Sequence, residues 1–319
     1  MPTYRFPRSI LLTAVATSLV VAGCSKSDRP APPTTNAPAV VDYPVTGKVI
    51  AVAADRGTAI VHHDEIPGFM PPMTMEFIVK ADVLARLKEG DLLRARLTEP
   101  RPGSGELHLE DIVVLDPVKE SAIAASAAQL RQDTSMRGKG AYREMGETLP
   151  SFTLYNQEGE VVPVTHFRGR WLVLNFIYTR CPIATMCPAS TQRMMDLQRA
   201  AHAKGFTHVE LASISLDPAY DTPPVLKAYA LARGIDLANF TFLTGPEGAV
   251  RDLLHQFGVI VEPGDNYLKH TLSTLLINPE GKIVHRVDGT NWSPDEILRR
   301  IPAPKLAGAT TARASRALR

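Results

Sequence analysis

Two cysteines, Cys181 and Cys187, are the residues whose type and spacing most clearly indicate chemistry. They lie six positions apart, each is followed by proline, and the third cysteine, Cys24, is near the start of the chain. The apolar run 171–178 predicts a buried strand before the pair, and a helical pattern follows at 189–204. Open α/β sheets place functional groups at such strand-to-helix turns. A dithiol there could hold a soft metal ion, cycle between dithiol and disulfide, or staple a loop.

The position of Cys187 predicts an activated thiol. Pro188 suits the first turn of a helix, which places Cys187 at or near the helix N-terminus. The helix dipole there favours a thiolate, and Arg180 would add to this effect if it pointed inward. A lowered thiol pKa suits both metal binding and disulfide exchange, so it does not separate these two uses.

A second set of candidate ligands lies far upstream. Met73 and Met75 alternate along an expected strand, so both thioethers face the same side, while Met70 and His63 approach from the preceding loop and strand. Thioether and imidazole donors suit Cu(I) or Ag(I) better than zinc, calcium or magnesium. The alternative is that these methionines fill the core of a small domain.

Residues 43–116 are expected to form a small all-β barrel of the OB type, because short strands alternate with turn signals. Residues 117–145 change in character and predict a linker, with a short helix at 121–130 followed by a mobile connection. The expected strands of the barrel lie around 45–52 and at 58–63, 74–79, 92–97 and 107–115, with a helical turn at 82–88.

Residues 146–301 alternate strands and helices, which predicts a thioredoxin-like α/β sandwich. His270 precedes an expected strand, 271–277, and follows an irregular loop at 261–269. In such a sheet this strand starts near the active-site turn, and two thiolates with one imidazole form a compact trigonal copper site. A lone histidine at a strand end is otherwise an ordinary surface residue. The other expected strands are 149–154, 171–178, 208–216, 240–243 and 282–287, and the expected helices are 189–204, 223–234, 247–257 and one after Ser293.

The first 24 residues predict a targeting segment, with arginines before an apolar stretch at 10–22. That stretch is far shorter than the ~20 residues of a membrane span. It ends at Cys24 in a pattern that resembles a bacterial lipoprotein signal, cleaved before a cysteine that then carries lipid; the alternative is an ordinary secretory signal. The mature protein is therefore expected outside the cytoplasm, anchored to a membrane. Residues 25–42 are expected to be a flexible tether and residues 302–319 a disordered tail.

The composition is that of an ordinary globular protein. The 319 residues are enough for two modest domains with tails. With 35 basic and 33 acidic residues the formal charge is +2, so nothing indicates a nucleic-acid partner.

Residues 146–301 resemble the Sco/SenC family of copper-binding thioredoxin-fold proteins. The resemblance implies copper ligands at Cys181, Cys187 and His270. The chain differs from the family pattern in one respect. The family usually has three residues between its cysteines, and this chain has five. The longer loop bears on both disulfide and copper geometry. The matching pieces are Gly-x-x-x-Pro-x-Phe-x-Leu at 146–154, Asn-Phe-Ile-Tyr-Thr-Arg-Cys-Pro at 175–182, Ser-Ile-Ser-Leu-Asp-Pro-x-x-Asp-Thr-Pro at 213–223, and Lys-His at 269–270.

Residues 43–116 resemble the CusF-like periplasmic copper-binding family, whose pattern joins a strand histidine to a Met-Thr-Met strand. The ligands that this resemblance implies are His63, Met73 and Met75. Of the two adjacent histidines, His63 is chosen because an Asp-x-Ile pattern follows it. Met70 stands where one well-known member type carries a copper-facing tryptophan, so it adds a fourth soft ligand or leaves the metal more exposed.

Together these features predict an extracytoplasmic, lipid-anchored copper metallochaperone. It would bind copper as Cu(I) or Cu(II) and deliver it for the assembly of respiratory cytochrome c oxidase, with an oxidase subunit as acceptor. A mobile linker would promote transfer between the two copper modules. One alternative is a membrane-anchored thiol–disulfide oxidoreductase in which Cys181 attacks and Cys187 resolves. Another is a copper sequestration or resistance protein, which would share every ligand.

Overall fold

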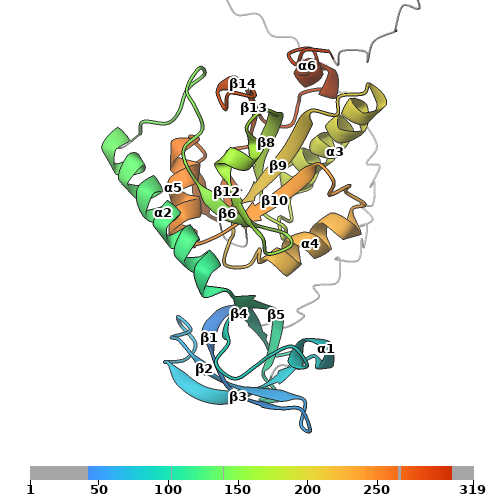
Figure 1. Cartoon of the computed structure of the whole chain (residues 1–319). Coiled ribbons are helices and arrows are strands. Elements are labelled where there is room, and N and C mark those ends of the chain that lie inside the picture. Colours follow the sequence, from blue (N-terminus) through green and yellow to red (C-terminus); the bar gives the residue numbers. More distant parts are fainter. Residues whose placement is uncertain (1–41, 102, 139, 265–266, 304–319) are drawn as a thin grey trace, which may run out of the picture. The chain divides into compact units, whose positions relative to one another are not determined.

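The computed structural model describes residues 42–101, 103–138, 140–264 and 267–303, whose elements are labelled in Figure 1. The predicted signal segment, the lipidation site Cys24 and the tether up to residue 41 lie outside the described residues, as does the predicted tail from residue 304. No described helix combines the length and the apolar character needed to cross a membrane.

The first domain is a closed barrel with strand order β1-β2-β3-β5-β4. β3 and β5 are parallel and the other neighbouring pairs are antiparallel, which confirms the predicted small all-β barrel. A bulge between Val49 and Ala51 interrupts the pairing of β1 with β2, and bulges bend strands so that a barrel can close. The elements are β1 Asp42–Ala53, β2 Thr58–His63, β3 Met73–Val79, α1 Ala81–Leu84, β4 Leu92–Thr98 and β5 His108–Leu115.

Helix α2, Pro117–Arg137, follows the barrel and is longer than the sequence predicts. The prediction of a short helix followed by a mobile connection is wrong for the described residues, because the helix continues to Arg137 and packs along α5, Glu247–Gln256. Asp116 caps its first turn by accepting hydrogen bonds from the N–H groups of residues 118 and 119.

Buried polar contacts fix the end of α2. The Arg143 guanidinium, 9% exposed, donates to Asp133 of α2 at 2.6 Å and to the Gln256 side chain at the end of α5 at 2.7 Å. Gln256 in turn donates to Asp133 at 2.9 Å. An ion pair with a buried guanidinium whose hydrogen bonds are satisfied favours a single geometry. The segment after α2 is therefore tied to the second domain.

The second domain is built on a seven-stranded sheet in the order β14-β13-β8-β9-β10-β6-β7. β8, β9 and β10 are parallel, whereas the strands on either side of them pair antiparallel. β9 is buried along its whole length, and β8 along all of it except Trp171. Such continuous burial is typical of central parallel strands. The strands are β6 Thr153–Asn156, β7 Val161–Pro163, β8 Trp171–Ile177, β9 Val209–Ser215, β10 Phe240–Thr244, β13 Ser273–Ile277 and β14 Ile283–Asp288.

Helices cover both faces of this sheet. α3, Cys187–Ala203, and α4, Pro223–Ala232, join successive parallel strands and lie on one face, while α5 lies on the other (Figure 1). Right-handed crossovers between parallel strands produce this arrangement. It confirms the predicted thioredoxin-like fold and places the start of α3 beside the carboxyl end of β8.

The segment before His270 differs from the prediction. Instead of an irregular loop at 261–269, the structure has two short strands, β11 Val261–Pro263 and β12 Leu268–His270, which pair antiparallel as a separate two-stranded sheet. His270 thus ends β12 and does not begin β13, which starts at Ser273. Strands of only three residues, half of them exposed, leave little periodicity for a sequence pattern to detect.

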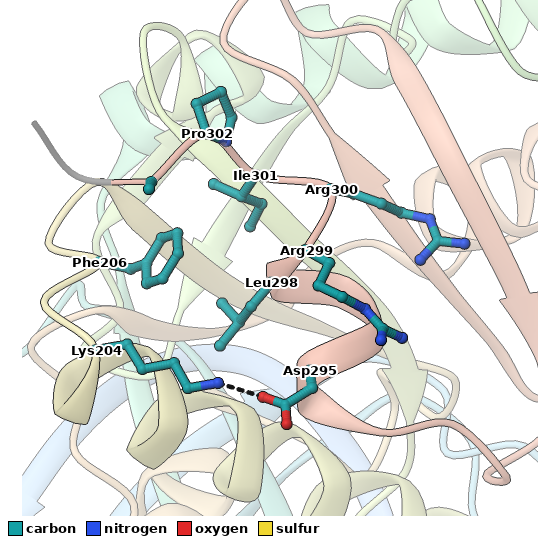
Figure 2. A pocket seen from close by; sticks show the side chains of 9 residues that line it. Lys204, Phe206, Asp295, Leu298, Arg299, Arg300, Ile301 and Pro302 are labelled. Carbon is teal, nitrogen blue, oxygen red and sulfur yellow. Dashed lines mark hydrogen bonds and ion pairs between the residues drawn. The ribbon is translucent and has the colours of Figure 1, made fainter.

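The last helix, α6 Pro294–Leu298, begins after Ser293, whose hydroxyl accepts from the Glu296 N–H as the sequence predicts. A hollow of about 730 Å³ lies between α6 and the end of α3, where Lys204 forms an ion pair with Asp295 (Figure 2). None of the candidate metal ligands lines this hollow.

Candidate metal centre

The turn between β8 and α3 carries both cysteines. Cys187 is the first residue of α3 and is fully buried, while Cys181 is 9% exposed. Between them the Met186 N–H donates to the Ile183 carbonyl at 2.9 Å, and both side chains pack against the core. The five intervening residues therefore form a compact turn that brings the thiols toward each other.

Cys181, Cys187 and His270 converge on one point. The two Sγ atoms and a ring nitrogen of His270 all lie within 4.8 Å of one another. The Cys187 Sγ lies 3.1 Å from His270 Nε2, and neither cysteine is in a disulfide. Two sulfurs and one imidazole nitrogen at this spacing fit a small soft ion such as copper. The longer loop thus does not keep the three side chains apart.

The backbone selects the tautomer of His270. Its Nδ1 lies 3.1 Å from the carbonyl oxygen of Thr271. Because a carbonyl oxygen only accepts, Nδ1 carries the ring proton and Nε2 is left with a lone pair facing Cys187. A metal-binding histidine is held in this way in many proteins, with one ring nitrogen bonded and the other free for the metal.

Burial keeps the Cys187–His270 pair neutral. It raises the pKa of the Cys187 thiol far above the ordinary value and lowers the pKa of His270. The thiol proton therefore stays on sulfur and is donated to Nε2. The prediction of a lowered thiol pKa is wrong for the metal-free chain, because burial disfavours the thiolate and Arg180 pairs with Asp217 at 2.7 Å.

Asp221 is a buried residue that lies within the motif at 213–223 and has no predicted role of its own. Its carboxylate is fully buried and accepts hydrogen bonds from the Thr179 hydroxyl at 2.5 Å, the Thr179 N–H at 3.2 Å and the Ser215 hydroxyl at 2.6 Å. These contacts tie the end of β9 to the segment that leads into Cys181. Burial raises the pKa of Asp221 to about 6, although the hydrogen bonds act in the opposite direction.

Replacing Asp221 by asparagine should stabilise the chain above about pH 6. The folded pKa of about 6 exceeds the ordinary 3.8, so between these values only the folded state holds the proton and stability falls as the pH rises. This difference corresponds to about 3 kcal/mol. Asparagine keeps an acceptor without the charge, so the pH dependence should flatten when unfolding is followed in denaturant from about pH 4 to pH 8.

The control for this experiment is Asp236→Asn, since Asp236 is an exposed carboxylate of the same domain that takes no part in the contacts of Asp221. In that variant we expect the free energy of unfolding to depend on pH as it does in the unmodified chain. If the free energy of unfolding of Asp221→Asn depended on pH as in the unmodified chain, Asp221 would not titrate in this range.

In the barrel, His63 and the methionines lie on one inward-facing row. His63 is opposite Met73 in the pairing of β2 with β3, and Met75 is opposite Val61. His63 is fully buried, Met75 is half-buried and Met73 is 44% exposed, so the row runs from the core to the rim. Met70, in the preceding loop, is half-buried against the same core. The two methionines thus share a face, as their spacing predicts.

His63 shows the clearest sign of a missing partner. Its Nδ1 lies 2.7 Å from the Asp64 carbonyl oxygen, so Nε2 again carries the lone pair. Nε2 is buried and accepts no hydrogen bond from any described residue. A buried acceptor without a partner is costly, and a metal ion would satisfy it. Gly47 lies opposite His63, and a Cβ there would come within 2.6 Å of the His62 carbonyl oxygen, so only glycine fits.

The seven-stranded sheet with the Cys181–Cys187–His270 cluster defines a thioredoxin-like protein with a thiol-based candidate metal centre. Residues 140–303, about half of the chain, match the family model described as SCO1/SenC, and the chain belongs to that family. Residues 42–108 match the model described as copper binding periplasmic protein CusF. Both resemblances noted in the sequence are confirmed by these matches.

Individual relatives match the second domain. The SCO1 protein homolog of Bacillus subtilis is 33% identical over 152 residues, which are 46% of this chain and 77% of that protein. The putative copper-binding protein of Stutzerimonas stutzeri is 29% identical over 140 residues, 42% of this chain and 66% of its own. The crystal structure of a SCO1/SenC family lipoprotein from Bacillus anthracis matches 50% of this chain and 96% of that chain, with 28% identity and a TM-score of 0.46.

Proposed function

We propose that the chain is a copper metallochaperone that binds its cargo between Cys181, Cys187 and His270. The observation that carries this proposal is the convergence of the three donor atoms within 4.8 Å. Thiolate and imidazole ligands suit copper, and the set matches the ligands that the Sco/SenC resemblance implies. Copper entering this site displaces the Cys187 proton that His270 Nε2 now accepts.

The barrel is the second copper site in this proposal. His63 Nε2 would bind the ion together with the thioethers of Met73 and Met75, and Met70 would be a fourth soft donor from the loop. The buried Nε2 without a hydrogen-bond partner supports this role, and so does the match to a copper-binding family model. The exposure of Met73 at the barrel rim suits an ion that must enter and leave.

The acceptor that we propose is a copper centre of respiratory cytochrome c oxidase. Membership of the SCO1/SenC family supports this target. We place the mature chain outside the cytoplasm, attached to a membrane through lipid on Cys24, because the sequence resembles a lipoprotein signal and the matching barrel model describes a periplasmic protein.

A thiol–disulfide oxidoreductase is the second candidate, and one observation favours it. Both cysteines are free and their sulfurs lie within 4.8 Å, which is close enough for a small movement to join them. Cys181, the more exposed thiol, would attack a target disulfide, and buried Cys187 would resolve the mixed disulfide. This reaction does not need His270 as a ligand.

Replacing His270 by alanine separates the two functions. If the chain carries copper, we expect the affinity of the second domain for Cu(I) to fall by more than ~100-fold, because the loss of a ligand costs more than the loss of a supporting residue. Disulfide reduction by the thiols should be little changed. Competition with a Cu(I) chelator and a thiol-exchange assay measure the two quantities on the purified, reduced chain.

His255→Ala serves as the matched control, since His255 lies in α5 outside the cluster. A His270→Ala chain that binds copper as tightly as the unmodified chain and still reduces disulfides would contradict the metallochaperone proposal. A copper-loaded chain that never passes its copper to an oxidase subunit would instead indicate sequestration.

A further inference from the structure

His270 is carried by a hairpin that does not belong to the central sheet. β11 and β12 pair only with each other, whereas both cysteines lie on the turn that leaves β8. Main-chain pairing with β8 therefore does not set the position of His270 relative to the thiols. Some other contact must hold the imidazole 3.1 Å from the Cys187 sulfur.

Tyr178 makes such a contact. It follows β8 directly, three residues before Cys181, and is 2% exposed. Its hydroxyl accepts from the Leu268 N–H at 3.1 Å and lies 3.3 Å from the Leu268 carbonyl, to which it can donate. One phenol thus binds both backbone groups of the residue two positions before His270.

The aromatic ring of Tyr178 also contacts the imidazole itself. The two rings meet edge to face, with centroids 5.7 Å apart and planes inclined by 76°. Burial raises the pKa of Tyr178, so the phenol keeps its proton. The same side chain therefore contacts both the hairpin backbone and the imidazole.

We propose that Tyr178 is a positioning residue of the copper centre, which holds His270 at the distance from the cysteine pair that the ion requires. The proposal rests on the proposed function of this site and adds a residue outside the ligand set. The hydrogen bonds of the Tyr178 hydroxyl to Leu268 join the segment after β8 to the hairpin that carries the imidazole. A residue that holds a metal-binding histidine typically accounts for about 10–100-fold in metal affinity.

Tyr178→Phe tests the proposal because it keeps the ring and removes only the hydroxyl. We expect a fall of about 10–100-fold in the copper affinity of the second domain, measured on the purified, reduced chain. In a His270→Ala background the same substitution should cost little, since residues that act through one another are not additive. The Cu(II) spectrum should show weaker coupling to the imidazole nitrogen.

Tyr155→Phe is the matched control, because Tyr155 is also buried and its hydroxyl donates to Glu120 of α2. That variant should keep the copper affinity even if both variants lose stability. If Tyr178→Phe lowered the copper affinity by the same factor in the unmodified and the His270→Ala chains, the proposal would be overturned. The tyrosine would then act on copper binding by a route other than His270.

A metal-free measurement separates this proposal from the proposed function. Hydrogen exchange at the Leu268 amide should accelerate in Tyr178→Phe and stay unchanged in Tyr155→Phe. Unchanged exchange in Tyr178→Phe would overturn the positioning role whatever the chain binds. A chain that shows the expected exchange but binds no copper at the cysteines would overturn the proposed function and leave Tyr178 as the residue that anchors the hairpin.

Discussion

Replacing Cys187 by serine should reduce the copper bound per chain from two ions to one. Cys187 is fully buried at the start of α3, and its sulfur lies at the centre of the contacts with His270. Serine has nearly the same shape, but its hydroxyl is a hard donor and a poor ligand for Cu(I). Titration of the purified, reduced chain with Cu(I) against a competing chelator measures both stoichiometry and affinity.

The barrel is the internal control for the Cys187→Ser experiment, because its proposed ligands lie on β2 and β3 and include no cysteine. The remaining ion should therefore bind with the affinity that the barrel has in the unmodified chain. Retention of two ions of unchanged affinity by Cys187→Ser would mean that the second domain holds its copper elsewhere.

Replacing His63 by leucine should have two effects of opposite sign. Copper binding by the barrel should be lost, because the imidazole is its one nitrogen donor in the proposed set. The metal-free chain should become more stable by about 1–3 kcal/mol, which is the usual cost of a buried polar atom without a partner. Leucine fills similar space without a polar atom to satisfy.

The measurement is unfolding of the barrel with and without copper. Copper stabilises a folded domain that binds it, so the unmodified chain should gain stability and His63→Leu should not. His62→Leu is the matched control, since His62 is the exposed neighbour whose ring bonds Thr74 on the outer face. A His63→Leu chain that is less stable and still responds to copper would contradict the assignment of His63.

The sequence predicts the parts of this structure that follow from local patterns. Alternating apolar residues indicate the five barrel strands, and the run before Cys181 indicates a central strand that ends in a dithiol turn. His270 becomes a candidate only through the expected fold, since the sequence separates it widely from the cysteines. The structure then brings its ring to the same point as the two sulfurs.

The features that the sequence does not predict depend on tertiary packing. The contact of α2 with α5 and the Arg143–Asp133 ion pair stabilise the far end of α2, and helix propensity does not reveal either contact. Burial raises the pKa of the Cys187 thiol, and the spacing of the cysteines in the sequence does not reveal how deeply this thiol is buried. Tyr178 resembles any aromatic residue at the end of a buried strand until its hydroxyl is seen to bind Leu268.

Both candidate histidines use Nδ1 to bond the carbonyl of the following residue, so both present an unprotonated Nε2 before any metal arrives. In the proposed function, the barrel ligands are an imidazole and thioethers, none of which is a thiol. Copper entering the dithiol site must displace thiol protons. In the proposed function, copper uptake by the cysteine site is therefore coupled to the release of thiol protons, and we expect this site to bind copper more tightly as the pH rises.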